Sequence, residues 1–113
     1  MIVAVVGVGV IGGSVGLAAR RRLGATVRGI DPHASEALAA GAIDEAHDDL
    51  GAALEGADAA VVVTEWPELR ELDWAEAQLR MRGNVVVDGR NLLDADEMRS
   101  LGFAYEGIGR AVS

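Results

Sequence analysis

Three glycines with a fixed spacing are the residues of this chain best suited to hold a ligand. Gly7, Gly9 and Gly12 form the pattern G-x-G-x-x-G. They lie between a wholly apolar run at 2–6 and a segment of helical character at about 12–23. In this pattern the first glycine makes a tight turn, the second lets a pyrophosphate approach the backbone, and the third lets the helix pack closely on the strand. The free N–H groups at the start of the helix then attract the phosphate charge.

An acidic residue lies where a bound dinucleotide would need one. Asp31 follows the expected strand at 26–30 and comes about 20 residues after Gly12, the spacing of the acid that hydrogen-bonds the adenosine ribose. Its charge would repel a 2′-phosphate, so NAD is favoured over NADP. The alternative is a glycine turn kept for packing and an aspartate that caps the next turn, with no ligand bound.

The composition narrows the class of protein. Half of the 113 residues are hydrophobic and a quarter are charged, as in a soluble globular domain. There is no cysteine, which excludes disulfides and thiolate catalysis. The net charge of −8 disfavours nucleic acid as a partner, because phosphate backbones are bound by surplus arginine and lysine. The opening apolar run is too short for a signal peptide or a membrane span, so we expect a cytoplasmic protein with no membrane partner.

Apolar runs alternate with segments of helical character along the whole chain. Strands are expected at 2–6, 26–30, 42–46, 59–63, 84–87 and 103–106. Helices are expected at about 12–23, 34–40, 48–54 (begun by Asp48 as N-cap), 69–81 and 94–101. This alternation predicts right-handed βαβ units. Six such strands fit one α/β domain over residues 1–113, with a doubly wound parallel sheet in the order 3-2-1-4-5-6.

Two further side chains are expected at the carboxyl ends of the strands, where doubly wound folds bind their ligands. Thr64 follows the fourth expected strand and could hydrogen-bond a ribose. Arg90 follows the fifth and could pair its planar guanidinium with a phosphate. The alternative is a simple Asp-Gly turn at Asp88 and Gly89, with Arg90 in an ion pair with a nearby acid such as Glu65.

The two tryptophans bear on association. Trp66 and Trp74 are expected to pack against partner domains in a longer relative. In an isolated domain they would lie exposed and favour self-association. A homodimer through such surfaces is therefore a further expectation.

The first part of the chain resembles a known cofactor domain. Within residues 2–46 the strings "AVVGVGVIGGSVGLAAR", "VRGIDP" and "GAIDEA" are similar to the cofactor domain of prephenate and arogenate dehydrogenases. These are NAD(P)-dependent enzymes of aromatic amino-acid synthesis. The resemblance implies NAD contacts at Gly7, Gly9, Val10, Ile11, Gly12 and Asp31.

The second part resembles a different domain. From about residue 57 onward, "GADAAVVVTEWPELREL" and "VVVDGRNLLDADEMRSLGFAYEGIGR" look like the last segment of UDP-glucose and related UDP-sugar 6-dehydrogenases. In that family the segment belongs to the C-terminal, Rossmann-like UDP-binding domain. The resemblance implies a nucleotide and substrate contact at Arg90. Residues 47–60 fit both families, so no junction is placed within them.

Two resemblances in one chain indicate a chimera, engineered or recombined, of Rossmann-like halves at about 1–56 and 57–113. A natural relative with both traits is the alternative. The catalytic histidine of the first family has no counterpart after the fourth strand, and the catalytic cysteine of the second is absent. We therefore predict no catalytic residue and no metal site, but a minimal domain that binds a dinucleotide, NAD preferred, without turnover. The alternatives are a folded scaffold with a vestigial motif and a weak NAD-dependent dehydrogenase fragment that needs a partner domain.

Overall fold

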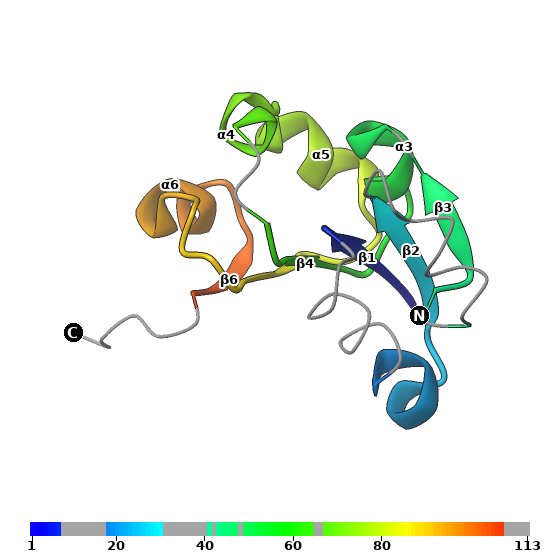
Figure 1. The fold of residues 1–113 in the computed structure, drawn as a ribbon. Helices are drawn as coiled ribbons and strands as arrows, with labels where there is room; N and C mark the ends of the chain where they lie inside the picture. Colours follow the sequence, from blue (N-terminus) through cyan, green and yellow to red (C-terminus); the bar gives the residue numbers. More distant parts are fainter. Residues whose placement is uncertain (8–17, 31–40, 42, 48, 65–66, 108–113) are drawn as a thin grey trace.

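Six parallel strands form one sheet in the order β3-β2-β1-β4-β5-β6 (Figure 1). The computed structural model describes residues 1–7, 18–30, 41, 43–47, 49–64 and 67–107. Every neighbouring pair of strands is parallel. The predicted doubly wound α/β fold and its strand order are therefore confirmed. The strands are β1 (Ile2–Val6), β2 (Thr26–Ile30), β3 (Glu45–His47), β4 (Ala59–Val62), β5 (Val85–Asp88) and β6 (Ala104–Gly107).

Helices cover both faces of this sheet. Residues 18–23 are helical and lie on one face, whereas the other helices lie along the opposite face (Figure 1). The expected helix at 34–40, and the part of the first helix before residue 18, lie outside the described residues. Where the chain is described, no helix has the length and hydropathy needed to span a bilayer. The helices of the second face are α3 (Leu50–Leu54), α4 (Glu68–Glu71), α5 (Trp74–Arg80) and α6 (Ala95–Ser100).

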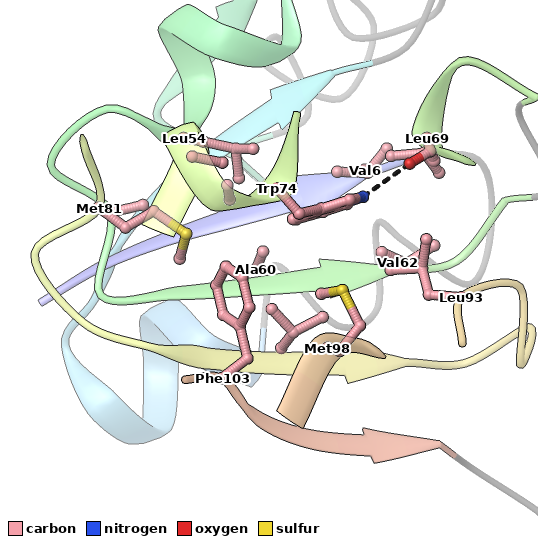
Figure 2. Packing of buried hydrophobic residues seen from close by; sticks show 14 of the residues in the cluster. Val6, Leu54, Ala60, Val62, Leu69, Trp74, Met81, Leu93, Met98 and Phe103 are labelled. Atoms are coloured by element: carbon pink, nitrogen blue, oxygen red, sulfur yellow. Dashed lines mark hydrogen bonds between the residues drawn. The ribbon is translucent and has the colours of Figure 1, made fainter. Parts of the chain in front are cut away.

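Alternate residues of a strand pack on opposite faces of the sheet. On β1, Ala4 and Val6 belong to the larger core cluster, which Figure 2 shows. Val3 and Val5 belong to a second cluster that includes Ala19 of the helical segment 18–23. Both faces of β1 are thus covered, which is why its sequence is apolar throughout rather than alternating.

The third strand begins later than its sequence predicts. We expected it at 42–46, but pairing with β2 starts at Glu45, which is in register with Arg28. Just before it, the Asp44 carboxylate accepts a hydrogen bond from the Val27 N–H at 2.8 Å. The Asp44 N–H also donates to the Val27 carbonyl oxygen at 2.8 Å. Backbone and side chain of Asp44 therefore both hold β2 directly before β3, which has three residues.

The N-cap of the next helix is also one residue later than predicted. The Asp49 side chain accepts a hydrogen bond from the Ala52 N–H at 3.2 Å, and Asp48 lies outside the described residues. Either aspartate has the right chemistry for a cap. Because α3 begins at Leu50, the N-cap is the residue directly before it, Asp49.

The single helix predicted at 69–81 is wrong, because the chain forms α4 and α5 there. Leu72 ends α4 in an extended conformation (φ −63°, ψ 138°). Asp73 then begins α5, and its carboxylate accepts a hydrogen bond from the Glu76 N–H at 3.1 Å. This N-cap replaces the continuous hydrogen-bond ladder that a single helix would have had.

The break between α4 and α5 places Trp74 in the core. The indole is 5% exposed, and its Nε1–H donates to the Leu69 carbonyl oxygen at 2.7 Å (Figure 2). Its ring also meets Phe103 edge to face, with centroids 5.8 Å apart and planes at 87°. The Trp74 side chain is therefore buried, whereas we expected it to be exposed in an isolated domain. Trp66 lies outside the described residues, so the homodimer stays a prediction.

We predict that Gly83→Ala destabilises the fold and that Gly51→Ala does not. A Cβ on Gly83 would lie 2.1 Å from the carbonyl oxygen of Asp58, so the backbone must shift, at a cost of about 1–3 kcal/mol in the free energy of unfolding. A Cβ on Gly51 would lie 3.6 Å from the Asp49 carboxylate, an ordinary contact. Alanine in this helix should raise the free energy of unfolding by up to about 1 kcal/mol. Urea denaturation measures both changes, and wild-type stability for Gly83→Ala would contradict the close approach.

Candidate functional site

The carboxyl ends of four strands finish in one row across the sheet. Val6 of β1 is in register with Ile30 of β2 and with Val62 of β4. Val62 is in turn in register with Asp88 of β5. Neighbouring strands lie about 4.8 Å apart, so the row is about 14 Å long. The loops that follow these strands therefore begin side by side along one edge, which we call the carboxyl edge.

Backbone hydrogen bonds extend the sheet by one residue into three of these loops. The Val63 N–H donates to the carbonyl oxygen of Val6 at 3.0 Å. The Gly7 N–H donates to the carbonyl oxygen of Ile30 at 2.8 Å. The Gly89 N–H donates to the carbonyl oxygen of Val62 at 2.7 Å. The first loop residues after β1, β4 and β5 are thus fixed by the sheet itself.

Gly7 turns the chain out of β1 at the point where the strand order reverses. Its φ is +88°, in the left-handed region that glycine adopts without strain. A Cβ at this position would lie 2.6 Å from Cβ and 2.8 Å from Cγ2 of Thr64. Gly7 and Thr64 therefore meet at the switch point between β1 and β4, which is where doubly wound folds bind their ligands.

The structure describes three of the residues predicted to contact a dinucleotide, and it brings two of them together. Gly7 and Thr64 are in contact, as above. Arg90 lies two residues past the end of β5, with an exposed side chain. Glu65, the ion-pair alternative for Arg90, lies outside the described residues. So do the other predicted contacts, which are Gly9, Val10, Ile11, Gly12 and Asp31.

Sequence reasoning missed the part that Asp88 plays at this edge. Its side chain is fully buried at the end of β5. One carboxylate oxygen accepts from the Arg90 N–H at 3.0 Å, and the other accepts from the Leu93 N–H at 2.8 Å and from the Tyr105 hydroxyl at 2.7 Å. An aspartate directly before a glycine is a local signal for a turn of this kind. Its contact with Tyr105, 17 residues away, leaves no local signal.

The groups at the carboxyl edge suit the binding of an anion. Arg90 supplies a guanidinium, which can bind a phosphate through two parallel hydrogen bonds, whereas the N–H groups of Gly7 and Gly89 already donate within the sheet. In the part of the chain that the structure describes, no three histidine, aspartate or glutamate side chains are grouped to hold a metal ion.

A family model for the UDP binding domain of the UDP-glucose/GDP-mannose dehydrogenase family matches residues 17–95. The chain belongs to this dehydrogenase family. The match runs across residues 47–60, where the two resemblances met, so one family accounts for sequence on both sides of the expected junction. The chimera of two Rossmann-like halves stays a prediction. The glycine loop at 7–12 precedes the matched segment.

Curated relatives in the dehydrogenase family are longer proteins. The UDP-glucose 6-dehydrogenase of Pseudomonas aeruginosa is 44% identical over 101 residues, covering 83% of this chain and 22% of the relative. The UDP-glucose 6-dehydrogenase TuaD of Bacillus subtilis is 37% identical over 92 residues, covering 80% and 20%. The chain thus spans about a fifth of the length of these relatives.

Solved structures give the same architecture. The UDP-D-ManNAc dehydrogenase of Pyrococcus horikoshii matches 96% of this chain and 25% of its own, with a TM-score of 0.70 and 27% identity. An arogenate dehydrogenase of Synechocystis matches 95% of this chain and 40% of its own, with a TM-score of 0.70 and 24% identity. The second likeness shows the fold alone.

We predict that Gly7→Ala costs more stability than Gly24→Ala. Both glycines have positive φ, +88° and +62°, so alanine is strained at either position by about 1 kcal/mol or more. Only at Gly7 would the new Cβ also meet Thr64, because nothing lies within 4 Å of the Cβ position on Gly24. The extra loss in the free energy of unfolding caused by Gly7→Ala should be smaller in a Thr64→Gly background, because that variant lacks the clashing Cβ and Cγ2 atoms. A double-mutant cycle by urea denaturation measures the coupling. An equal cost of Gly7→Ala in both backgrounds would contradict the contact.

Proposed function

We propose that this domain binds a nucleotide through its diphosphate at the carboxyl edge of the sheet, with NAD as the preferred ligand. The observation that carries the proposal is the conformation of Gly7 against Thr64. The first glycine of a G-x-G-x-x-G pattern is expected to make a tight turn at a strand end. Gly7 has the positive φ of such a turn, and its backbone passes too close to Thr64 for any side chain.

The remaining contacts follow from the order of the strands. Loops after β2, β1, β4 and β5 leave the same edge, so an extended ligand can be contacted by all four. On this proposal the glycine loop and the Arg90 guanidinium hold the pyrophosphate, Asp31 accepts hydrogen bonds from the adenosine ribose, and Thr64 contacts the second ribose. The residues assigned to the cofactor are Gly7, Gly9, Val10, Ile11, Gly12, Asp31, Thr64 and Arg90.

A second candidate ligand is UDP or a UDP-sugar. The observation that favours it is the family match, whose description is a UDP binding domain. A UDP diphosphate presents the same chemistry to Arg90 as the pyrophosphate of NAD. The glycine loop, which precedes the matched segment, is the feature that favours the dinucleotide.

We propose further that the chain binds without turnover by itself. Bound NAD would supply a hydride acceptor. The described carboxyl edge would add the Thr64 hydroxyl and the Arg90 guanidinium, which would position a ligand, and the chain has no cysteine to act as a nucleophile. Because the chain spans about a fifth of its curated relatives, we assign it the role of a nucleotide-binding part of a larger dehydrogenase.

A titration with three nucleotides tests the proposal. NADH, NADPH and UDP are titrated separately into the purified domain, with NADH fluorescence for the reduced cofactors and calorimetry for UDP. We expect saturable binding of NADH at concentrations up to about 1 mM and weaker binding of NADPH. Saturation by UDP alone would favour the second candidate, and no saturation by any of the three would overturn the proposal.

The variant Asp31→Ser sharpens this test, with Glu106→Gln as its control. Asp31→Ser should weaken NADH binding by about tenfold, since a charged hydrogen bond to the ribose is lost, and it should narrow the preference for NADH over NADPH. Glu106→Gln removes one negative charge from β6, on which Glu106 is exposed, and should leave both affinities unchanged. Equal effects of the two variants would show that only net charge matters and that Asp31 does not contact the ribose.

A further inference from the structure

The loop between β5 and α6 is folded around one buried carboxylate. Both oxygens of Asp88 are occupied: one accepts from the Arg90 N–H at 3.0 Å, and the other accepts from the Leu93 N–H at 2.8 Å and the Tyr105 hydroxyl at 2.7 Å. No part of the Asp88 side chain is exposed. Two of the three donors are backbone groups of the loop itself.

A buried carboxylate is a costly way to end a strand. Removing it from water is unfavourable, and only well-placed donors offset that cost. An apolar side chain would fill the same place in the core at no such cost. The carboxylate instead gives the loop a specific shape, because it accepts hydrogen bonds from two N–H groups that lie three residues apart in the loop.

The rest of the loop has little freedom to adopt another shape. Asn91 has a φ of +52°, in the left-handed region that asparagine tolerates better than most residues. A Cβ on Gly89 would lie 3.0 Å from the Val62 carbonyl oxygen, so this residue is pressed against β4. Arg90 stands between these two residues, and its side chain is exposed at the carboxyl edge.

We propose that Asp88 is a positioning residue for diphosphate binding, acting through Arg90. By holding the Arg90 N–H from the buried side, the carboxylate fixes the backbone at Arg90 and so the direction in which its side chain leaves the loop. The inference rests on the proposed function, because it assigns the geometry of a group that the diphosphate would contact. It adds that the affinity of Arg90 for phosphate depends on a side chain that touches no ligand.

A double-mutant cycle tests whether Asp88 acts through Arg90. The variants are Asp88→Asn, Arg90→Gln and the double variant, each titrated with NADH and with UDP. The asparagine amide has one acceptor oxygen in place of two, so it cannot hold both loop N–H groups and the Tyr105 hydroxyl. For whichever of the two nucleotides binds to the wild-type domain, we expect either single variant to lower the affinity by about tenfold or more. The double variant should be no more than about twofold weaker than Arg90→Gln.

Tyr105→Phe is the matched control. It removes the Tyr105 hydroxyl, which donates to this carboxylate at 2.7 Å and to the Leu93 carbonyl oxygen at 3.2 Å, but it leaves both loop N–H groups on Asp88. We expect it to lower the free energy of unfolding and to leave nucleotide affinity within about twofold of wild type. A loss of affinity equal to that of Asp88→Asn would show that general destabilisation, rather than the shape of the loop, governs binding.

A second pair of variants keeps the proposal testable if Asp88→Asn fails to fold. Asn91→Gly and Asn91→Val both remove the exposed amide, but a β-branched residue cannot easily adopt positive φ. Asn91→Val should therefore bind at least about tenfold more weakly than Asn91→Gly. Equal affinities for this pair would overturn the inference, as would additive effects of the Asp88 and Arg90 variants. Wild-type domain that binds neither NADH nor UDP would overturn the proposed function, and this inference with it.

Discussion

The register between β1 and its two neighbours is the constraint on which the candidate site depends. Val6 is aligned with Ile30 on one side and with Val62 on the other, so the chain leaves all three strands at the same height. A slip of one residue would turn the side chains of β1 to the wrong faces. It would also separate Gly7 from Thr64, because their contact lies one and two residues beyond the aligned row. The packing of the core and the geometry of the carboxyl edge thus depend on the same register of β1 with β2 and β4.

Membership of the dehydrogenase family and the glycine loop point to related ligands by different routes. The family is described by UDP binding, and its match begins after the loop. The loop has the spacing expected for a dinucleotide. UDP and a dinucleotide both carry a diphosphate attached to a ribose, and on our proposal both would meet the same edge of the sheet. On our proposal the sheet and the Asp88 turn serve diphosphate binding in general, and the loops after β1 and β2 decide which nucleotide is preferred.

The order of the strands could be predicted because apolar runs and helical segments alternate in a chain with few other solutions. The errors arose where a single side chain decides a boundary. Asp73 lies three residues before Glu76, a helix-start signal that was hidden within an otherwise helical pattern, and so α4 and α5 were merged. The burial of Trp74 followed from that break. Asp88 could be placed at the edge of the sheet, but its partner Tyr105 is distant in sequence, so the burial of its charge could not be predicted.

On our proposal a nucleotide binds at the carboxyl edge, next to the switch point between β1 and β4. The most direct test is an amide NMR titration of the isotope-labelled domain with NAD⁺. Our account predicts that shift changes concentrate on the amides of Gly7, Thr64 and Gly89 and saturate together. The amides of Asp58 and Gly83, at the opposite end of the strands, should change little. Shift changes that concentrate at Asp58 and Gly83, or that are absent from Gly7 at saturation, would contradict the claim.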